Sequence, residues 1–451
     1  MKKNDSVELF ITGTTAEGMG VGRSDGIAVF VPMTAEGDLI KATIVKVGKS
    51  FAYGKAEEII IPSDRRVPPD CEHYRLCGGC VFRHISYEEE CRVKERRIND
   101  TLRRIGGANI SCEQYIAAEN PDRYRNKAQL PCRLGKEGEP LLGFYATHSH
   151  RVIDCGDCLL QPAEFAAITE AFRKFLRDTD AEIYDEEAHK GRVRHLYLRR
   201  SNSTGEIMAC VVVNGNGLHG EETLVQLLRD ACPAITGVII NSNREKTGVI
   251  MGKKFRTVWG SDCITETLRG LKFSISPASF FQVNPVGANL LYERAFEYAG
   301  LTGTETLLDL YCGTGTIGLS MAAGAKQIIG VEIVPEAVEN ARQNAETNGI
   351  ENAEFICSDA EQAAVLLKER GITPDVVVLD PPRKGCTAKL LSVIAEMKPR
   401  RIVYISCDCA TLARDVKLLS EYGFAARRMT GVDMFPRTAH VETCVLLENL
   451  T

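Results

Sequence analysis

The sequence contains no apolar stretch of the roughly 18 residues that a membrane-spanning helix needs. Its N-terminus, MKKNDSVELF, becomes acidic and alternating before the hydrophobic region of a secretory signal could form, so we expect a cytoplasmic protein. Internal repeats and low-complexity tracts are also missing. Hydrophobic residues (44%) and charged residues (25%) occur in ordinary globular proportions, which excludes the disordered, collagen-like and fibrous classes. The 451 residues suffice for about three domains.

An excess of positive charge is missing as well. The chain has 55 Lys and Arg against 60 Asp and Glu, a net charge of −5, which argues against nucleic-acid binding by bulk electrostatics. Two runs without acidic residues, 123–133 and 190–200, break this pattern. Alternating arginines share one face of a strand, and Tyr124 and Tyr197 lie among them for stacking. We therefore expect both runs to contact phosphates.

Cysteine, in contrast, is plentiful. An odd count of 17 in a reducing compartment indicates metal ligands and reactive or buried thiols, because disulfides do not persist there. Cys71-x5-Cys77-x2-Cys80 forms a polar, glycine-containing cluster, and Cys155 or Cys158 is the nearest fourth ligand. Four thiolates suit zinc or an iron-sulfur cluster, and the spacing does not choose between them.

The hydrophobic pattern changes twice along the chain. Residues 1–60 alternate in short runs separated by glycines, which predicts an OB-like β-barrel. Residues 70–265 combine a helix near 87–105 with strand runs and an amphipathic helix around 165–175, which predicts an α+β domain. Residues 271–451 repeat strand, turn and helix, so the fold class is α/β, with a doubly wound, Rossmann-like parallel sheet. The run 441–448 would add an edge strand.

A glycine-rich turn closes the first strand of this sheet, in the run 308–318, and opens a helix, so it predicts a nucleotide cofactor. Glu332 ends the second strand and is placed to take ribose hydroxyls. The glycines at 313, 315 and 318 also spell G-x-G-x-x-G, which keeps a nicotinamide cofactor as an alternative. The turn Asp380-Pro-Pro-Arg383 after the fourth strand favours S-adenosylmethionine, because such a turn is typical of enzymes that methylate bases or amines.

The fifth strand ends in Ser406-Cys407-Asp408-Cys409, which places Cys407 at the carboxyl edge of the sheet, where active sites of open α/β folds form. A thiolate there suits methylation of uracil. C5 of uracil is too weak a nucleophile until a group adds at C6, and a soft thiolate adds well.

Five ordered motifs carry a family resemblance: 280–284 (FFQVN), the glycine turn, 380–383, 406–415 and 440–442 (HVE). Over nearly its whole length the chain resembles RNA (uracil-5-)-methyltransferases. Its barrel and cysteine-bearing front half resemble the ribosomal-RNA branch of RumA type, whose N-terminal barrel is called a TRAM domain. The architecture of that branch implies that the helix near 87–105 packs on the C-terminal domain.

The resemblance implies that Cys407 attacks C6 and that Glu442 removes the C5 proton, yielding 5-methyluridine. Its expected S-adenosylmethionine contacts are Gln282, Tyr311, Gly313, Gly315, Glu332, Asp380 and, more weakly, Asp359. It also implies a four-iron four-sulfur (4Fe-4S) cluster on Cys71, Cys77, Cys80 and Cys158, with Cys155 a bystander. Because the target base must leave its stack to reach Cys407, we expect it to flip into a pocket with Phe280 and Phe281 as candidate walls; the alternative is that these two phenylalanines belong to the core. Asp309 is expected to shape the glycine turn.

The expected substrate is 23S ribosomal RNA, which makes the protein an rRNA-processing enzyme; we expect no membrane partner and a monomer. Two alternatives stay open: the same reaction on transfer RNA, and a non-catalytic iron-sulfur RNA-binding or assembly protein. Radical chemistry is disfavoured, because it needs C-x3-C-x2-C spacing with one iron left open. One departure stands out: the family usually has proline after the Asp or Asn that follows the nucleophile, whereas here Cys409 follows Asp408. The absence of this proline removes a constraint on the backbone, so the rigidity of the loop is in question. Cys409 also becomes a second thiol that could compete with Cys407.

Overall fold

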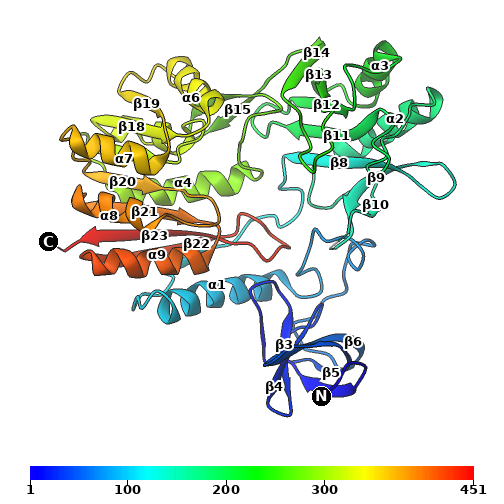
Figure 1. The fold of residues 1–451 in the computed structure, drawn as a ribbon, viewed down its shortest axis with the longest axis horizontal. Coiled ribbons are helices and arrows are strands. Elements are labelled where there is room, and N and C mark those ends of the chain that lie inside the picture. Colours follow the sequence, from blue (N-terminus) through cyan, green and yellow to red (C-terminus); the bar gives the residue numbers. More distant parts are fainter. Residues whose placement is uncertain (148, 451) are drawn as a thin grey trace.

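The computed structural model describes residues 1–147 and 149–450, which form three large β-sheets, a separate two-stranded sheet and their helices (Figure 1). Within these residues no helix has the length and apolar character needed to cross a membrane. The methyltransferase-like α/β class expected from the sequence is confirmed in the C-terminal part. A β-rich N-terminal part precedes it.

The N-terminal sheet has six strands in the order β1-β5-β6-β4-β3-β2. They are β1 (Ser6–Phe10), β2 (Gly13–Thr14), β3 (Gly20–Ser24), β4 (Ile27–Val31), β5 (Leu39–Val47) and β6 (Phe51–Ile61). Alternation places one side of each strand inward, so that Leu9, Val29, Ile40 and Ala52 form part of its small core. The loop at 33–38 turns back toward the rest of the chain, where Thr34 accepts a hydrogen bond from His84.

The second sheet has seven strands, in the order β10-β9-β8-β11-β12-β13-β14, with two helices packed on it. The strands are β8 (Lys127–Leu134), β9 (Pro140–Tyr145), β10 (Val152–Asp154), β11 (Val193–Arg200), β12 (Ile207–Val213), β13 (Ile235–Ser242) and β14 (Lys254–Gly260), and the helices are α2 (Glu164–Asp178) and α3 (Glu221–Ala231). A separate hairpin, β15 (Ile264–Leu268) and β16 (Leu271–Ile275), leads into the C-terminal part.

The basic runs lie largely inside this second sheet, so the predicted phosphate contacts are wrong for their central residues. Both faces of β11 are covered, and Arg194, Tyr197 and Arg199 are at most 3% exposed. The Arg199 guanidinium donates to the carbonyls of Ser279 and Phe281. Tyr124 is also buried and donates to the carbonyl of Pro436. These side chains tie the second sheet to the C-terminal part instead of facing RNA.

The C-terminal sheet has eight strands, in the order β19-β18-β17-β20-β21-β23-β22-β7. The strands are β17 (Thr306–Leu310), β18 (Gln327–Glu332), β19 (Ala353–Cys357), β20 (Val376–Leu379), β21 (Arg401–Ser406), β22 (Phe424–Val432), β23 (Glu442–Asn449) and β7 (Gln114–Ile116). The helices of this part are α4 (Pro285–Ala299), α5 (Thr316–Ser320), α6 (Pro335–Thr347), α7 (Ala360–Glu369), α8 (Ala388–Glu396) and α9 (Cys409–Glu421), with a 3-10 turn at Ala322–Gly324. Apolar cores lie on both faces of the sheet, as expected for a parallel sheet covered by helices.

The last strand is not at the edge of the sheet, contrary to the prediction for 441–448. β23 pairs with β21 on one side and β22 on the other, both antiparallel. The edge is formed by β7, which pairs parallel to β22 and comes from the first third of the chain. Its short run 114–116 carries no strong strand pattern, and this explains why the sequence did not reveal it.

Helix α1 (Tyr87–Arg104) also joins this C-terminal part. Ser86 caps its N-terminus by accepting from the Glu89 N–H. Ile98 and Leu102 are fully buried in the core that includes α9, whereas Ile105 lies just beyond the helix and is 47% exposed. Figure 1 shows α1 between the C-terminal sheet and the N-terminal sheet.

Candidate active site

The topology of the C-terminal sheet brings the expected site residues to one edge. β17, β18, β19, β20 and β21 are mutually parallel, so their carboxyl ends meet there. β23 runs the opposite way and therefore begins at this edge, with Ser406 paired to Thr443. Cys407, which follows β21, and Glu442, which starts β23, are thus neighbours although they are far apart in the sequence.

The glycine-rich turn after β17 has an unusual backbone. Tyr311, Gly313 and Gly315 all have positive φ, at 67°, 56° and 80°. Glycine adopts this region without steric cost, whereas a tyrosine there is uncommon. A strained residue at the end of a central strand is typical of a functional turn. Gly315 caps α5, and the turn leaves space beside it, because a Cβ atom on Gly313 would meet nothing within 4 Å.

Asp309 supports this turn from inside the protein. Its Oδ2 accepts a hydrogen bond from the Gly318 N–H at 2.8 Å, and a Cβ atom on Gly318 would clash with that oxygen. Burial raises the pKa of Asp309 to about 7. The side chain therefore shapes the turn, as expected.

Two carboxylates follow the neighbouring strands. Glu332 accepts from the backbone N–H groups of Gly313 and Val334, so it is fixed against the glycine turn. Asp359 follows β19 and caps α7 by accepting from the N–H groups of Glu361 and Gln362. Both lie at the edge where a nucleotide-like cofactor would sit, and Asp359 is already engaged by its helix.

The run 280–284 enters the site from the start of α4. Phe281 is buried in the core, whereas Phe280 is 74% exposed, so only Phe280 is free to stand beside a flipped base. The Gln282 backbone carbonyl accepts from the Asn126 side chain. Asn284 caps α4 and donates to the carbonyl of Met434, which joins this segment to the loop before β23.

The loop that carries Cys407 is held without the proline that the resemblance expects. Asp408 caps α9 by accepting from the N–H groups of Ala410 and Thr411, both at 2.9 Å, and the Ser406 hydroxyl contacts Asp408 through two hydrogen bonds. Cys409 is 2% exposed and forms the first residue of α9. The Asp408 cap therefore orders the loop in place of the proline. Because Cys409 is buried and Cys407 is partly exposed, Cys409 does not compete with Cys407 as a nucleophile.

Four ionisable groups act on one another at this edge. Burial raises the pKa of Glu442 to about 8; the Asp380 carboxylate adds to this rise, and Arg383 opposes it. Burial also raises the pKa of Asp380 to about 7 and that of Cys407 to about 11, where Glu442 again raises it and Arg383 lowers it. A thiol, two carboxyl groups and a guanidinium whose charges interact in a partly buried site form a candidate centre for proton transfer and nucleophilic attack. The sequence alone does not indicate a role for Arg383, although this residue ends the 380–383 turn.

The loop 433–441, between β22 and β23, is anchored from three sides. Val81 and Phe82, just after Cys80, donate to the Arg437 carbonyl. Lys94 and Arg97 of α1 donate to the carbonyls of Phe435 and Ala439. His440 lies 3.4 Å from Arg383. None of these contacts follows from a sequence motif, because the partners are distant in the chain.

The four cysteines expected to bind a cluster lie near one another. Burial raises the pKa of Cys80 to about 11, with Cys158 and Cys71 adding to the rise, and Cys77 and Cys71 likewise act on Cys158. Cys155 is buried beside them, with a pKa raised to about 12. Within residues 1–147 and 149–450, however, no three His, Cys, Asp or Glu side chains converge as ligands of a single metal ion. Four neighbouring thiols are the donors that the sequence predicts for a cluster, and the cluster stays a prediction.

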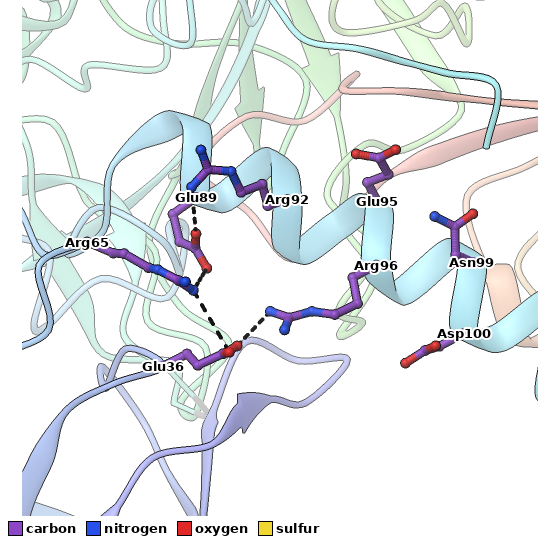
Figure 2. A pocket seen from close by; sticks show the side chains of 8 residues that line it. All are labelled: Glu36, Arg65, Glu89, Arg92, Glu95, Arg96, Asn99 and Asp100. Atoms are coloured by element: carbon purple, nitrogen blue, oxygen red, sulfur yellow. Dashed lines mark hydrogen bonds and ion pairs between the residues drawn. The ribbon is translucent and has the colours of Figure 1, made fainter. Parts of the chain in front are cut away.

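A cavity of about 410 Å³ lies elsewhere, between α1 and the N-terminal sheet (Figure 2). Charged side chains line it. Glu36 pairs with Arg96 at 2.7 Å, and the buried Glu89 pairs with Arg65 at 2.9 Å. Because its carboxylates are largely paired with arginines, we interpret it as an ionic junction between α1 and the sheet.

Comparisons with known proteins agree with this geometry. The family model described as tRNA (Uracil-5-)-methyltransferase matches residues 246–450. An uncharacterized RNA methyltransferase of Clostridium tetani is 43% identical over 99% of this chain and 97% of its own length. One from Halalkalibacterium halodurans is 41% identical over 99% of this chain and 98% of its own length. Among solved structures, Pyrococcus abyssi tRNA (uracil-54, C5)-methyltransferase in complex with S-adenosyl-L-homocysteine is similar, with a TM-score of 0.80 and 27% identity over 98% of this chain and 100% of that one.

Proposed function

Since the chain belongs to the RNA (uracil-5-)-methyltransferase family and is an S-adenosylmethionine-dependent enzyme, we propose that it methylates uridine in 23S ribosomal RNA through a covalent bond to Cys407. The observation that carries the mechanism is the meeting of Cys407, Glu442, Asp380 and Arg383 at the carboxyl edge of the C-terminal sheet.

The first step is addition of the Cys407 thiolate to C6 of a flipped uracil, which moves electron density onto C5. C5 then takes the methyl group of S-adenosylmethionine, and S-adenosylhomocysteine leaves. Arg383 favours the thiolate, because its charge lowers the pKa of Cys407 against the opposing effects of burial and Glu442.

The second step is removal of the C5 proton by the Glu442 carboxylate. The electrons of the C5–H bond reform the C5–C6 double bond, the C6–S bond breaks, and the Cys407 thiolate is released. The pKa of Glu442 is raised to about 8, which suits it to remove this proton, because a base whose pKa is close to the pH of the reaction both takes and releases a proton readily.

The cofactor site is proposed at the glycine turn. The Gly313 and Gly315 backbone allows close approach, Glu332 is fixed beside it to receive the ribose hydroxyls, and Tyr311 and Asp359 stand on either side at the ends of β17 and β19. Gln282 and Asp380 complete the set nearest to the reacting carbon. Glu442 is 6% exposed, so water has little access to the proposed base.

A 4Fe-4S cluster is proposed on Cys71, Cys77, Cys80 and Cys158. Iron would bind the thiolates and order this polar segment. In support, Cys77, Cys80 and Cys158 are partly buried thiols that act on one another, and the backbone N–H of Gly79 already donates to the Cys77 sulfur.

Transfer RNA is the second candidate substrate. The similar Pyrococcus abyssi protein is named as a tRNA methyltransferase, and its structure covers 98% of this chain. The presence of an N-terminal sheet and a cysteine segment therefore does not by itself tell an rRNA enzyme from a tRNA enzyme. The ribosomal proposal depends on the resemblance of the front half to the ribosomal branch.

The test is transfer of labelled methyl from S-adenosylmethionine to unmodified 23S rRNA and, separately, to unmodified tRNA, followed by nucleoside analysis. We expect labelled 5-methyluridine from 23S rRNA; label from tRNA alone would move the protein to the second candidate. The variant Cys407→Ala should abolish turnover and retain RNA binding, and Cys409→Ala, which changes a buried neighbour, is the matched control. Turnover by Cys407→Ala would contradict the covalent mechanism.

A further inference from the structure

Three aromatic side chains gather on the outer face of the N-terminal sheet. Phe30 lies on β4, and Phe51 and Tyr53 lie on β6. Their ring centroids are 5.6 to 5.8 Å apart in all three pairs. The alternate residues Val29 and Ala52 are fully buried in the core of the sheet, so the three rings point the other way. We call Phe30, Phe51 and Tyr53 the aromatic triad.

The pairing of the strands explains why the rings meet. β4 and β6 are parallel neighbours, with Phe30 opposite Tyr53 and Ala28 opposite Phe51. All three aromatic residues are partly exposed. Their recorded ring contacts, within the part of the chain that the structure describes, are only with one another. The triad therefore does not serve to dock this sheet onto the rest of the protein, which is done by the loops at 33–38 and 63–66.

Cations surround the triad. Lys46 lies directly opposite Tyr53 in the β5–β6 pairing, and Lys49 follows at the tip of the same hairpin. Both are exposed, and no ion pair is recorded for either within residues 1–147 and 149–450. Arg23, on β3, lies opposite Ala28, which shares its face of β4 with Phe30. Positive charge beside partly exposed aromatic rings is complementary to a polyanion that carries flat bases.

We propose that the aromatic triad is a stacking site for unpaired bases of RNA. Exposed aromatic rings on small barrels bind successive bases through their π-faces, while nearby cations hold the phosphates. A duplex keeps its bases stacked inside, so the site selects single-stranded RNA. The inference rests on the proposed function only in taking RNA as the partner. It adds a second contact, on the N-terminal sheet, that would hold a loop or end of the substrate while the target uridine is at Cys407. In Figure 1 β4 lies at the side of this sheet remote from α1.

The test measures binding of the full chain to a fluorescein-labelled 12-nucleotide oligouridine and to a 12-base-pair RNA duplex. The variant Phe30→Leu/Phe51→Leu/Tyr53→Leu keeps apolar bulk and removes the rings. It should bind the oligouridine at least about 10-fold more weakly, which is about 1.4 kcal/mol, and bind the duplex as before. The matched control is Phe10→Leu, an aromatic residue of the same sheet that is 57% exposed and outside the triad. Unchanged affinity of the triple variant for oligouridine would overturn the inference.

A second measurement locates the contact. Oligouridine carrying 5-iodouridine, cross-linked by light to the unsubstituted protein, should yield modified peptides containing Phe51 and Tyr53. Cross-links confined to the C-terminal part would refute the site, even if the triple variant failed to fold. Neither readout requires methyl transfer, so a chain that methylates no RNA yet loses oligouridine binding in the triple variant would sink the proposed function and leave this inference standing. If the triad binds a protein instead of RNA, the triple variant should bind oligouridine as before and no cross-link should form at Phe51 or Tyr53.

Discussion

The ammonium group of Lys94 on α1 lies 2.8 Å from Oδ1 of Asp433, 339 residues later in the chain. Lys94 also lies 2.7 Å from Oε1 of Glu90, and all three side chains are at most 1% exposed. Glu90 in turn accepts from the Arg437 N–H. This buried group ties α1 to the loop that leads to Glu442, so the proposed base depends on a helix from the first quarter of the chain.

Replacing Lys94 with methionine should destabilise the protein by about 3 to 5 kcal/mol, because it removes the ammonium group that faces two buried carboxylates, Glu90 and Asp433. Urea unfolding monitored by circular dichroism measures the loss. Arg92→Met is the control, because Arg92 is on the same helix and its side chain is 67% exposed. It pairs with Glu89 at the long distance of 3.5 Å, so its loss should cost less than about 1 kcal/mol. Equal effects of the two changes would contradict the importance of the buried group.

Glu442→Gln should raise thermal stability at alkaline pH and leave it nearly unchanged in acid. The folded-state pKa of about 8 lies above the ordinary value of 4.5, so between these values the native state binds more protons than the unfolded state. The free energy of unfolding therefore falls as pH rises through this window, and the neutral amide removes that loss. Melting temperatures at pH 4.5 and pH 9 test this. The control is Glu448→Gln, a half-buried residue at the other end of β23, which should change the melting temperature little at either pH.

Methyl transfer should accelerate with pH. The Cys407 thiol, with a pKa of about 11, must lose its proton, and Glu442, with a pKa of about 8, must be ionised to act as base. We expect kcat/KM to rise by about tenfold per pH unit or more below pH 8. A profile that is flat between pH 6 and pH 8 would show that neither group titrates as proposed.

Asp408→Ala should weaken the loop of the proposed nucleophile. Loss of the cap on α9 costs about 1 kcal/mol in stability and should lower kcat while leaving S-adenosylhomocysteine binding, measured by calorimetry, intact. Asp408→Asn keeps the side-chain oxygen that accepts from Ala410 and Thr411 and should retain most of both properties. If the alanine variant turns over normally, the cap does not replace the missing proline.

Glu36→Gln should loosen the junction drawn in Figure 2. It removes the partner of Arg96 and a neighbour of Arg65. The pairs are partly exposed, so the expected change is below about 1 kcal/mol and disappears at high salt. Trypsin cleavage within residues 62–66, followed with time at low and high salt, is the measurement. Faster cleavage of the variant at low salt is expected, and a difference that persists in 1 M salt would point to a non-ionic cause.

The α/β order of the C-terminal part was predictable because most of its strands are largely apolar runs and several of the turns between its elements carry a glycine or a proline. The nearness of Cys407 and Glu442 was expected from family resemblance alone, since it depends on β23 entering the sheet in reverse between β21 and β22. The arginines of β11 were misjudged for a related reason. Alternation shows that Arg194 and Tyr197 lie on opposite faces of a strand, but only the three-dimensional arrangement shows that both faces are covered. Lys94, Asp433 and the β7 edge have no local signal.

The position of β7 and α1 has a consequence for biosynthesis. The edge strand β7 and the helix α1 are synthesised some 300 residues before β22, the strand with which β7 pairs. Both can therefore pack on the C-terminal sheet only when synthesis of the chain is nearly complete. A fragment beginning near residue 271 would lack both. It would expose the backbone edge of β22 and the apolar surface that receives Ile98 and Leu102, and such an edge recruits other chains. Excised at the apparent boundary, the half that holds the candidate active site should aggregate rather than catalyse.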